Sequence, residues 1–391
     1  MTEPDAIAVT SLVLANIQEA CRRTEYRTPI SFISRGDSCL RGHYPAEVDT
    51  ITQHITRNDT ATTEPHNVVT ILLPAFIEGG RITKDSIHYV KEGDHFIPVG
   101  ETPFAKDPHF SFHASNLREY VKEKTQGRIT DAQIKSVTLS DMRDEDKGIH
   151  YIMNILLSCA NGDVVVVDLE EQADMEIFVT GLLRCEQTQH KKKKQTFVYR
   201  TAASFVASRC GISYKPLLTA ADITDTPIAN TVASTAPPSP GGLIVVGSYV
   251  PKTTAQLSSL CDTMDIQEIE FDVTLFQALR EASPALVTAM TDSITQQINR
   301  FLKLGKHVVF YTSRREVVSS TAKNKTTKKY DSIDDFTAVS DALTAVVDGL
   351  EIAPSFLIAK GGITSHDVAH KGLHVSKARV VGQVATGIPG T

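Results

Sequence analysis

The strongest constraint on the fold of this chain is a continuous apolar run near its middle. Gly162-Asp-Val-Val-Val-Val-Asp-Leu169 holds four consecutive valines with an acidic residue on each side. A strand with one face in water alternates apolar and polar residues, whereas a strand covered on both faces is apolar throughout. Covered strands are typical of parallel sheets with helices on both faces. The run therefore predicts an α/β fold.

Other apolar runs and helical patterns alternate along the rest of the chain. We expect further strands at residues 29–33, 67–73, 243–247, 307–311 and 354–359. Apolar residues at helical spacing predict helices at residues 7–23, 115–124, 145–158, 171–184, 253–264, 284–304 and 334–350. Alternating strands and helices indicate parallel sheets covered by helices.

A change of composition divides the chain into two parts. Residues 219–242 contain almost no large apolar side chain and end in Ala236-Pro-Pro-Ser-Pro-Gly-Gly242, which is typical of a linker. A chain of 391 residues is also long enough for two or three domains at about 100–200 residues each. We therefore expect one α/β domain at residues 1–218, a linker at 219–242 and a second α/β domain at 243–391.

Composition excludes several classes of protein. The net charge of −6 argues against a general binder of nucleic acid, which usually presents a basic surface. No apolar run approaches the ~18 residues of a membrane-spanning helix, so no membrane partner is expected. Six scattered cysteines without a C-x-x-C pair, and an N-terminus without a secretory signal, predict free thiols in the cytoplasm. The basic runs 191–194 and 323–329 are interpreted as solvated loops.

The first candidate site follows the strand expected at residues 29–33. In Ser34-Arg-Gly-Asp-Ser-Cys-Leu-Arg-Gly-His43, Arg35 and Arg41 flank Asp37 and two glycines. Arginine binds carboxylates and phosphates with a fork of N–H groups, and glycine lets backbone amides approach an anion. Open α/β sheets bind ligands where strands end. The segment predicts an anion or sugar site, with a charged surface turn as the alternative.

Three further turns after strands could serve the same purpose. Glu78, Gly79, Gly80 and Arg81 follow the strand at 67–73 and suggest a second wall of that site, or else a tight turn. In the second domain, Val246-Gly-Ser-Tyr249 and Lys360-Gly-Gly-Ile-Thr-Ser365 each lie between a strand and a helix. Amides at such a turn face phosphate, although neither segment matches a standard nucleotide-binding fingerprint.

Histidine pairs at helical spacing do not add up to a metal site. His109 and His113 are four residues apart, as are His366 and His370. Two such histidines can bind a metal on one helix face, but no third ligand is evident near either pair. We expect no protein-held metal centre.

Seven segments in a fixed order resemble the four-carbon acid sugar kinase family, which includes threonate, erythronate and 3-oxo-tetronate 4-kinases. The resemblance runs from about residue 7 to the C-terminus. It rests on the segments 34–43, 74–81, 98–107, 199–205, 246–256, 361–369 and 382–389.

This resemblance implies a two-domain α/β kinase, which binds the acid sugar in its N-terminal domain and ATP in its C-terminal domain. The phosphoryl group would pass from ATP, with Mg²⁺, to the terminal 4-hydroxyl of the sugar. Family positions that bind the substrate correspond to Arg35, Asp37, Ser38, Arg41, Gly42, Arg200 and Ser204. Those that bind the nucleotide correspond to Ser248, Gly361, Gly362, Ile363, Thr364 and Gly382. The partners implied are a small acid sugar, ATP and, as one oligomeric state, a second copy of the chain.

The chain departs from the family pattern at three places. Family members have an Asp-Asp-x-Thr-Gly segment before the position of residue 7 and a Pro-Gly-Asn-Val-Gly-like nucleotide loop after that of residue 391, and we expect this chain to lack both. Cys39 stands where a threonine is usual. Without the acidic segment, the catalytic residues are unknown and this exact chain is expected to be a poor kinase. The alternatives are an inactive or binding-only fragment, a part of a larger dehydrogenase, kinase and aldolase fusion, and a sugar-binding module that is not a kinase.

Overall fold

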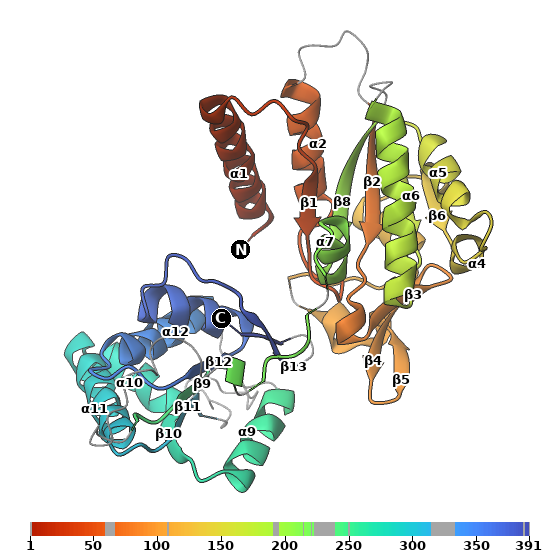
Figure 1. The fold of residues 1–391 in the computed structure, drawn as a ribbon. Coiled ribbons are helices and arrows are strands. Elements are labelled where there is room, and N and C mark those ends of the chain that lie inside the picture. Colours follow the sequence, from red (N-terminus) through yellow and green to blue (C-terminus); the bar gives the residue numbers. More distant parts are fainter. Residues whose placement is uncertain are drawn as a thin grey trace, which may run out of the picture. The chain divides into compact units, whose positions relative to one another are not determined.

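The computed structural model describes residues 2–58, 67–107, 109–190, 195–213, 215–219, 221–222, 239–248, 251–313, 333–385 and 388–390. These residues form two compact units (Figure 1). The first unit combines Met1–Leu218 with Gly382–Gly390, and the second is built from Thr219–Val381. The chain thus passes between the units twice. Both basic runs and most of the expected linker lie outside the described residues.

The first unit is built on a five-stranded parallel sheet. Its strand order is β1-β8-β2-β7-β6. The strands are β1 (Phe32–Arg35), β2 (Val68–Leu73), β6 (Ile134–Val137), β7 (Val164–Val167) and β8 (Thr196–Thr201). All four valines of β7 are buried, as expected for a strand between two helical layers. The sheet that the apolar run predicted is confirmed.

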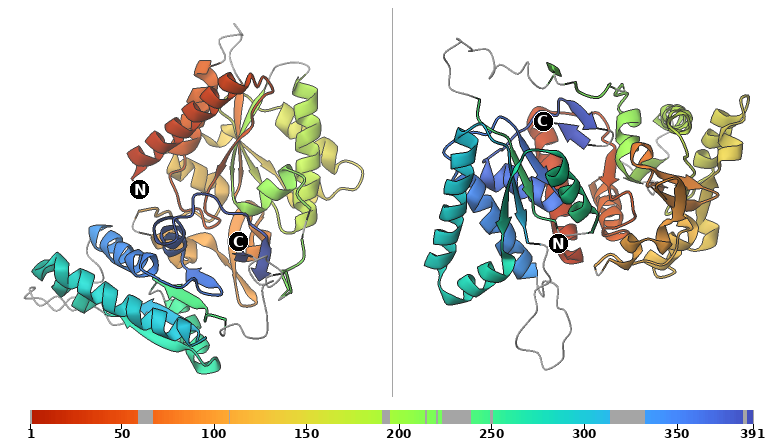
Figure 2. Two further views of the ribbon diagram at one scale, coloured as in Figure 1. Left: turned by 60° about the vertical axis from the view of Figure 1, so that its left-hand side comes forward. Right: turned by 90° about the horizontal axis from the view of Figure 1, so that it is seen from below.

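Helices cover both faces of this sheet, and each face has its own hydrophobic core. One core joins the sheet to α5 (Gly148–Leu157), α6 (Gln172–His190) and α7 (Ala203–Arg209). The other joins the opposite face to α1 (Glu3–Thr24), α2 (Ala46–Asn58) and α3 (Leu117–Lys124). Figure 2 (left) shows the red and orange helices on one side of the fanned strands and the green and yellow helices on the other.

Smaller elements decorate the same unit. An antiparallel meander follows β2, and its strands are β3 (Arg81–Lys84), β4 (Ile87–Glu92) and β5 (His95–Pro98). A short hairpin from the end of the chain, β13 (Gly382–Ala385) with β14 (Ile388–Gly390), is also counted with this unit. Single turns of helix complete it: η1 (Ile77–Gly79), η2 (Val99–Glu101), η3 (Pro103–Lys106), η4 (Asp131–Gln133) and α4 (Leu139–Met142).

The second unit contains a four-stranded parallel sheet in the order β10-β11-β9-β12. The strands are β9 (Leu243–Val246), β10 (Gln267–Phe271), β11 (Val308–Thr312) and β12 (Leu357–Lys360). One face packs against α9 (Pro251–Thr263). The other face packs against α10 (Val273–Ala282), α11 (Pro284–Lys303) and α12 (Ile333–Asp348), with α13 (Gly362–Asp367) and the π-helical turn η5 (Val368–Gly372) after β12.

Both units therefore have the α/β architecture expected from the sequence. Within the described ranges, every helix is too short or too polar to span a bilayer. All six cysteines lie in these ranges, and all six are free thiols.

Candidate functional site

In the first unit the candidate site lies where three neighbouring strands end. β8 lies between β1 and β2, and the three strands are parallel, so their carboxyl ends meet at one edge. After β1 the chain turns toward the face covered by α2 and α3, whereas after β8 it turns to α7 on the opposite face. Such a divergence of connections opens the crevice in which open α/β sheets bind ligands.

Arg41 and Asp37 form a forked ion pair on the loop after β1. The Arg41 Nε lies 3.1 Å from Asp37 Oδ2, and the Arg41 Nη2 lies 3.3 Å from Asp37 Oδ1. The Arg41 guanidinium also lies over the Phe104 ring, 5.1 Å from its centroid, and 3.8 Å from Asp107 Oδ2. The side chains of Arg41 and Asp37 are 37% and 32% exposed, so an anion or a hydroxyl can reach both.

A second arginine is buried beneath the same loop. Arg200, on β8, donates from Nη1 to Ser34 Oγ (2.8 Å) and forms an ion pair with Glu47 of α2. The backbone of Gly36 and Gly42 lies directly against its guanidinium, because a Cβ atom at Gly36 would fall 2.6 Å from Arg200 Cζ and one at Gly42 would fall 2.7 Å from Nη2. Glycine at these two positions lets the loop approach Arg200, since a larger residue would force the guanidinium to shift.

Two more buried side chains fix the loop through its backbone carbonyls. Tyr120 of α3 donates its hydroxyl to Leu40 O at 3.1 Å. His88 of β4 has Nε2 2.8 Å from Ser38 O and Nδ1 2.9 Å from Thr83 Oγ1. Because a carbonyl oxygen only accepts, Nε2 of His88 carries the proton and Nδ1 accepts from the threonine. These hydrogen bonds therefore restrict the movement of the loop that forms the site.

Burial of His88 predicts a specific pH dependence of stability. Its pKa is lowered from 6.5 to about 4, mainly by burial; the hydrogen bond to Ser38 and the Asp37 carboxylate oppose this shift, and the nearby Arg81 guanidinium contributes to it. The unfolded chain therefore takes up a proton near pH 6.5 that the folded chain refuses. Stability is complete above that pH and falls as the pH drops toward 4, by about 2 kcal/mol between pH 7 and pH 5.

Urea unfolding at the two pH values tests this. His88→Gln removes the titrating group. On acidification from pH 7 to pH 5, its free energy of unfolding should therefore fall by about 2 kcal/mol less than that of the wild type. His95→Gln, at an exposed position of β5, should behave as the wild type. An equal loss in the wild type and in His88→Gln would contradict the assignment of the neutral tautomer.

The turn after β2 forms a second cluster with the start of α7. Ser204, which is buried, donates to Glu78 Oε2 at 2.6 Å and accepts the backbone N–H of Ile77 at 3.1 Å. Its hydroxyl therefore holds this turn, and Glu78 remains exposed at the edge of the sheet.

Cys39, on the loop after β1, is a packing residue. Burial raises the pKa of its thiol, so the thiol stays neutral.

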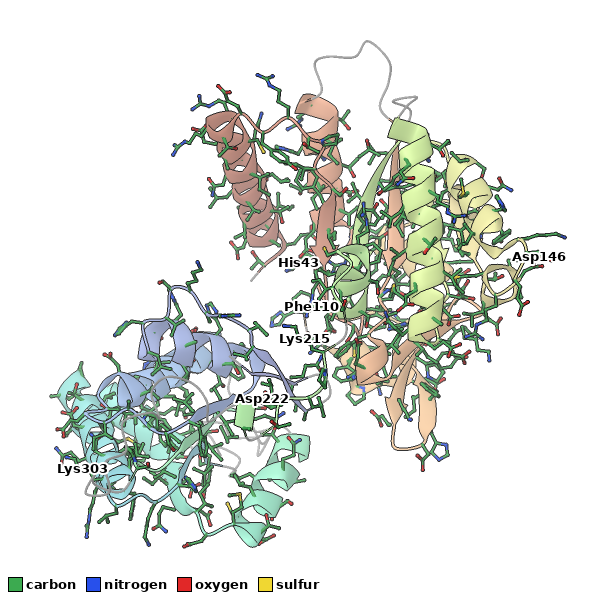
Figure 3. The ribbon with its side chains drawn as sticks, viewed as in Figure 1. His43, Phe110, Asp146, Lys215, Asp222 and Lys303 are labelled. Atoms are coloured by element: carbon green, nitrogen blue, oxygen red, sulfur yellow. The ribbon has the colours of Figure 1, made fainter. Side chains whose placement is uncertain are left out.

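The structure brings most of the expected substrate residues of the first unit together. Asp37, Ser38, Arg41 and Gly42 share one loop, and Arg200 lies against it. Arg35 is exposed at the end of β1, and strand alternation directs it to the sheet face opposite to Ser34. Figure 3 shows His43 and Phe110 beside this loop, with their rings 4.9 Å apart.

In the second unit, the turns after β9 and β12 lie side by side because these strands are neighbours. A Cβ atom at Gly361 would lie 3.5 Å from Thr364 Oγ1 and 3.7 Å from Ser248 Cβ. Gly361 has φ of +111°, a conformation that favours glycine. Four of the expected nucleotide-binding residues, Ser248, Gly361, Gly362 and Thr364, therefore form one cluster.

The space around this cluster suits a phosphate group. A Cβ atom at Gly362 would meet nothing within 4 Å, and Ile363 is 74% exposed. No acceptor for the amides of residues 362–364 is found in the described part of the chain, as is usual for the first turn of a helix. Phosphate oxygens are suitable partners for such amides.

Gly382 belongs to the first unit, whereas the other expected nucleotide-binding residues belong to the second. It begins β13 and packs on Leu218, whose amide donates to Gln383 O at 2.7 Å, and it is counted with the first unit. The described residues contain no group of three or more His, Cys, Asp or Glu side chains that could hold a metal ion.

Several residues that shape the first site were not identified from the sequence. Ser34, Glu47, His88 and Tyr120 hold the loop, but only Ser34 lies in a segment with a recognisable pattern. The contacts through which they hold the loop join residues that are 13 to 166 positions apart along the chain. The sequence showed only that polar residues follow the ends of strands. This feature does not identify hydrogen-bond partners on distant elements.

Two family models cover most of the chain. One, described as a sugar-binding N-terminal domain, matches residues 1–209, and the other, described as a nucleotide-binding C-terminal domain, matches residues 243–391. No curated protein matches the chain.

The chain is similar to several solved structures, and those with TM-scores above 0.5 share its fold. A Haemophilus influenzae protein of the DUF1537 family is 12% identical with a TM-score of 0.55, over 97% of this chain and 79% of that one. A Salmonella typhimurium LT2 protein, whose description proposes a tRNA synthase, is 15% identical with a TM-score of 0.57, over 92% and 74%. A Bordetella bronchiseptica DUF1537 protein, a domain-swapped dimer with bound citrate, is 16% identical over 100% and 76% of the two chains, with a TM-score of 0.37.

Proposed function

Because the chain belongs to the DUF1537 family of four-carbon acid sugar kinases, we propose that it transfers a phosphoryl group from ATP to the terminal 4-hydroxyl of a four-carbon acid sugar. Threonate, erythronate and 3-oxo-tetronate are the candidate substrates. The observation that carries the proposal is the half-exposed Arg41–Asp37 pair, on a loop held by buried side chains where three parallel strands end.

Arg41 and Asp37 suit the two ends of an acid sugar. The Arg41 guanidinium binds the carboxylate of the substrate, and Asp37 accepts hydrogen bonds from its hydroxyl groups. Arg35, Ser38, Gly42, Arg200 and Ser204 complete the proposed substrate site. Because Asp37 already occupies the Arg41 fork, the substrate carboxylate shares or replaces that contact.

The nucleotide is proposed to bind at the turns of the second unit. Ser248, Gly361, Gly362, Ile363 and Thr364 line this site, and Gly382 is included on the family pattern. The open space at Gly362 and the amides of residues 362–364 support contacts with phosphate oxygens. A bound Mg²⁺ would neutralise charge on the phosphates, while the chain's own groups orient the acceptor hydroxyl and the phosphates toward each other.

The proposal also includes the cellular compartment of the enzyme and its partners. Six free thiols support a reducing compartment, and we propose the cytoplasm. The partners are the acid sugar, ATP and a second copy of the chain in a homodimer. We propose no nucleic acid or membrane partner.

Turnover by the full chain tests the proposed function. With ATP, Mg²⁺ and each of the three acids in turn, we expect ADP to form with at least one acid, together with an acid phosphorylated at its 4-hydroxyl by phosphorus NMR. Chelation of the Mg²⁺ should stop the reaction. Calorimetric binding of ATP and acid without ADP formation would contradict kinase activity and favour a binding-only protein.

A further inference from the structure

Glu47 is not among the residues proposed to touch the substrate, yet it is paired with the arginine beneath the substrate loop. We infer that Arg200, Ser34 and Glu47 form a buried network that fixes the loop of residues 36–42, with Glu47 as its positioning residue. The consequence for acid binding rests on the proposed function, but the order of the loop does not.

The three side chains form a closed set of contacts. Arg200 Nη1 contacts both Ser34 Oγ and Glu47 Oε2, and the Ser34 hydroxyl donates to the same Glu47 oxygen at 2.9 Å. Ser34 thereby accepts from the arginine and donates to the glutamate. They come from β1, β8 and α2, so the network joins the two strands to the helix that follows the loop.

The arginine cannot stay in place without its acid. The side chain of Arg200 is 7% exposed, and Glu47 is the carboxylate paired with it in the described part of the chain. A buried cation that loses its anion is strongly destabilised, because little water can replace the lost charge. Neutral Glu47 would therefore make Arg200 move toward water or another acid.

Movement of Arg200 would be transmitted directly to the loop. Gly36 and Gly42, which lie near the two ends of the loop, are in contact with the Arg200 guanidinium. The Gly36 amide also donates to Thr201 O at 2.8 Å. Asp37 and Arg41 lie between these glycines. A shift of about 1 Å in groups that orient a substrate is enough to cost about 100-fold in rate, so the position of this loop is critical.

Helix α2 offers a matched control for Glu47. Asp49 lies two residues further along and also pairs with an arginine, Arg128, at 2.6 Å. Its side chain is 37% exposed and that of Arg128 is 54% exposed, and Asp49 has no contact with the loop among the described residues. Exposed pairs of this kind contribute little to stability.

Hydrogen exchange and acid binding are compared in Glu47→Gln and Asp49→Asn. In Glu47→Gln without ligand, we expect peptides covering residues 36–42 to exchange at least about tenfold faster, and acid binding to weaken by a similar factor. KM should rise more than kcat falls, and Glu47→Asp, which keeps the charge, should recover part of the loss. Asp49→Asn should behave as the wild type in every measurement.

The outcomes separate the two proposals. If the wild type binds none of the three acids, the proposed function fails, while exchange of residues 36–42 still decides the role of Glu47. Unchanged exchange in a folded Glu47→Gln variant overturns the inference. If that variant does not fold, Ser34→Ala, which keeps the ion pair, decides: faster exchange confined to the loop supports the network, and unchanged exchange overturns it.

Discussion

Replacing Gly362 with aspartate should abolish nucleotide binding while leaving the chain folded. The position is open, since a Cβ atom would meet nothing within 4 Å, so the new side chain fits. Gly362 is also the first residue of α13, where a carboxylate interacts favourably with the helix dipole. The same carboxylate would face the phosphates proposed to bind there, and like charges at close range repel strongly.

Calorimetric titration of the full chain with ATP and Mg²⁺ measures the effect. We expect affinity to fall by more than about 100-fold, which corresponds to about 2.7 kcal/mol. Gly362→Ala is the matched control, because it adds a side chain without charge and should bind within about threefold of the wild type. Equal affinities for the aspartate variant and the wild type would remove this turn from the nucleotide site.

The buried strands show what the sequence predicts well. The inner strand β7 consists of four valines, and the inner strand β2 is apolar except for Thr70. A continuous apolar run has few alternatives to a strand covered on both faces, so the α/β class followed from it. The strand expected at residues 29–33 begins instead at Phe32, because pairing with β8 starts there.

The central strand β8 was missed for a physical reason. Its sequence, Thr-Phe-Val-Tyr-Arg-Thr, carries an arginine and two threonines, although five of its six residues are buried. Its charge is tolerated because Glu47, 153 residues away, lies against it. A sequence pattern registers the polarity of Arg200 but cannot identify the acid that compensates it.

In the candidate site, too, local features could be predicted from the sequence and distant partners could not. The loop at residues 34–43 could be chosen because arginine, aspartate and glycine follow a strand, a local feature. The side chains that fix it come from α2, α3 and β4, and no local pattern marks Glu47, Tyr120 or His88. Residues that could touch a ligand were thus easier to predict from the sequence than the residues that position them.

Replacing Arg41 with lysine should weaken acid sugar binding by about 10- to 100-fold. Lysine keeps the charge but cannot present two N–H groups in one plane to a carboxylate, and it loses the planar contact over Phe104. Each charge-assisted hydrogen bond in such a site is worth about 1.5–3 kcal/mol, which gives the expected range. Because the Arg41 side chain is 37% exposed, the lysine ammonium can remain hydrated and folding should be little affected.

Arg22→Lys is the appropriate control, because Arg22 forms a fork of the same kind in an exposed place. Its Nε and Nη2 donate to the two oxygens of Glu19 at 2.7 and 2.8 Å on α1, and its side chain is 72% exposed. Loss of that exposed fork should change stability little and leave acid binding unchanged. Titration of both variants with threonate and erythronate decides the question: if the two lose the same affinity, Arg41 does not bind the carboxylate.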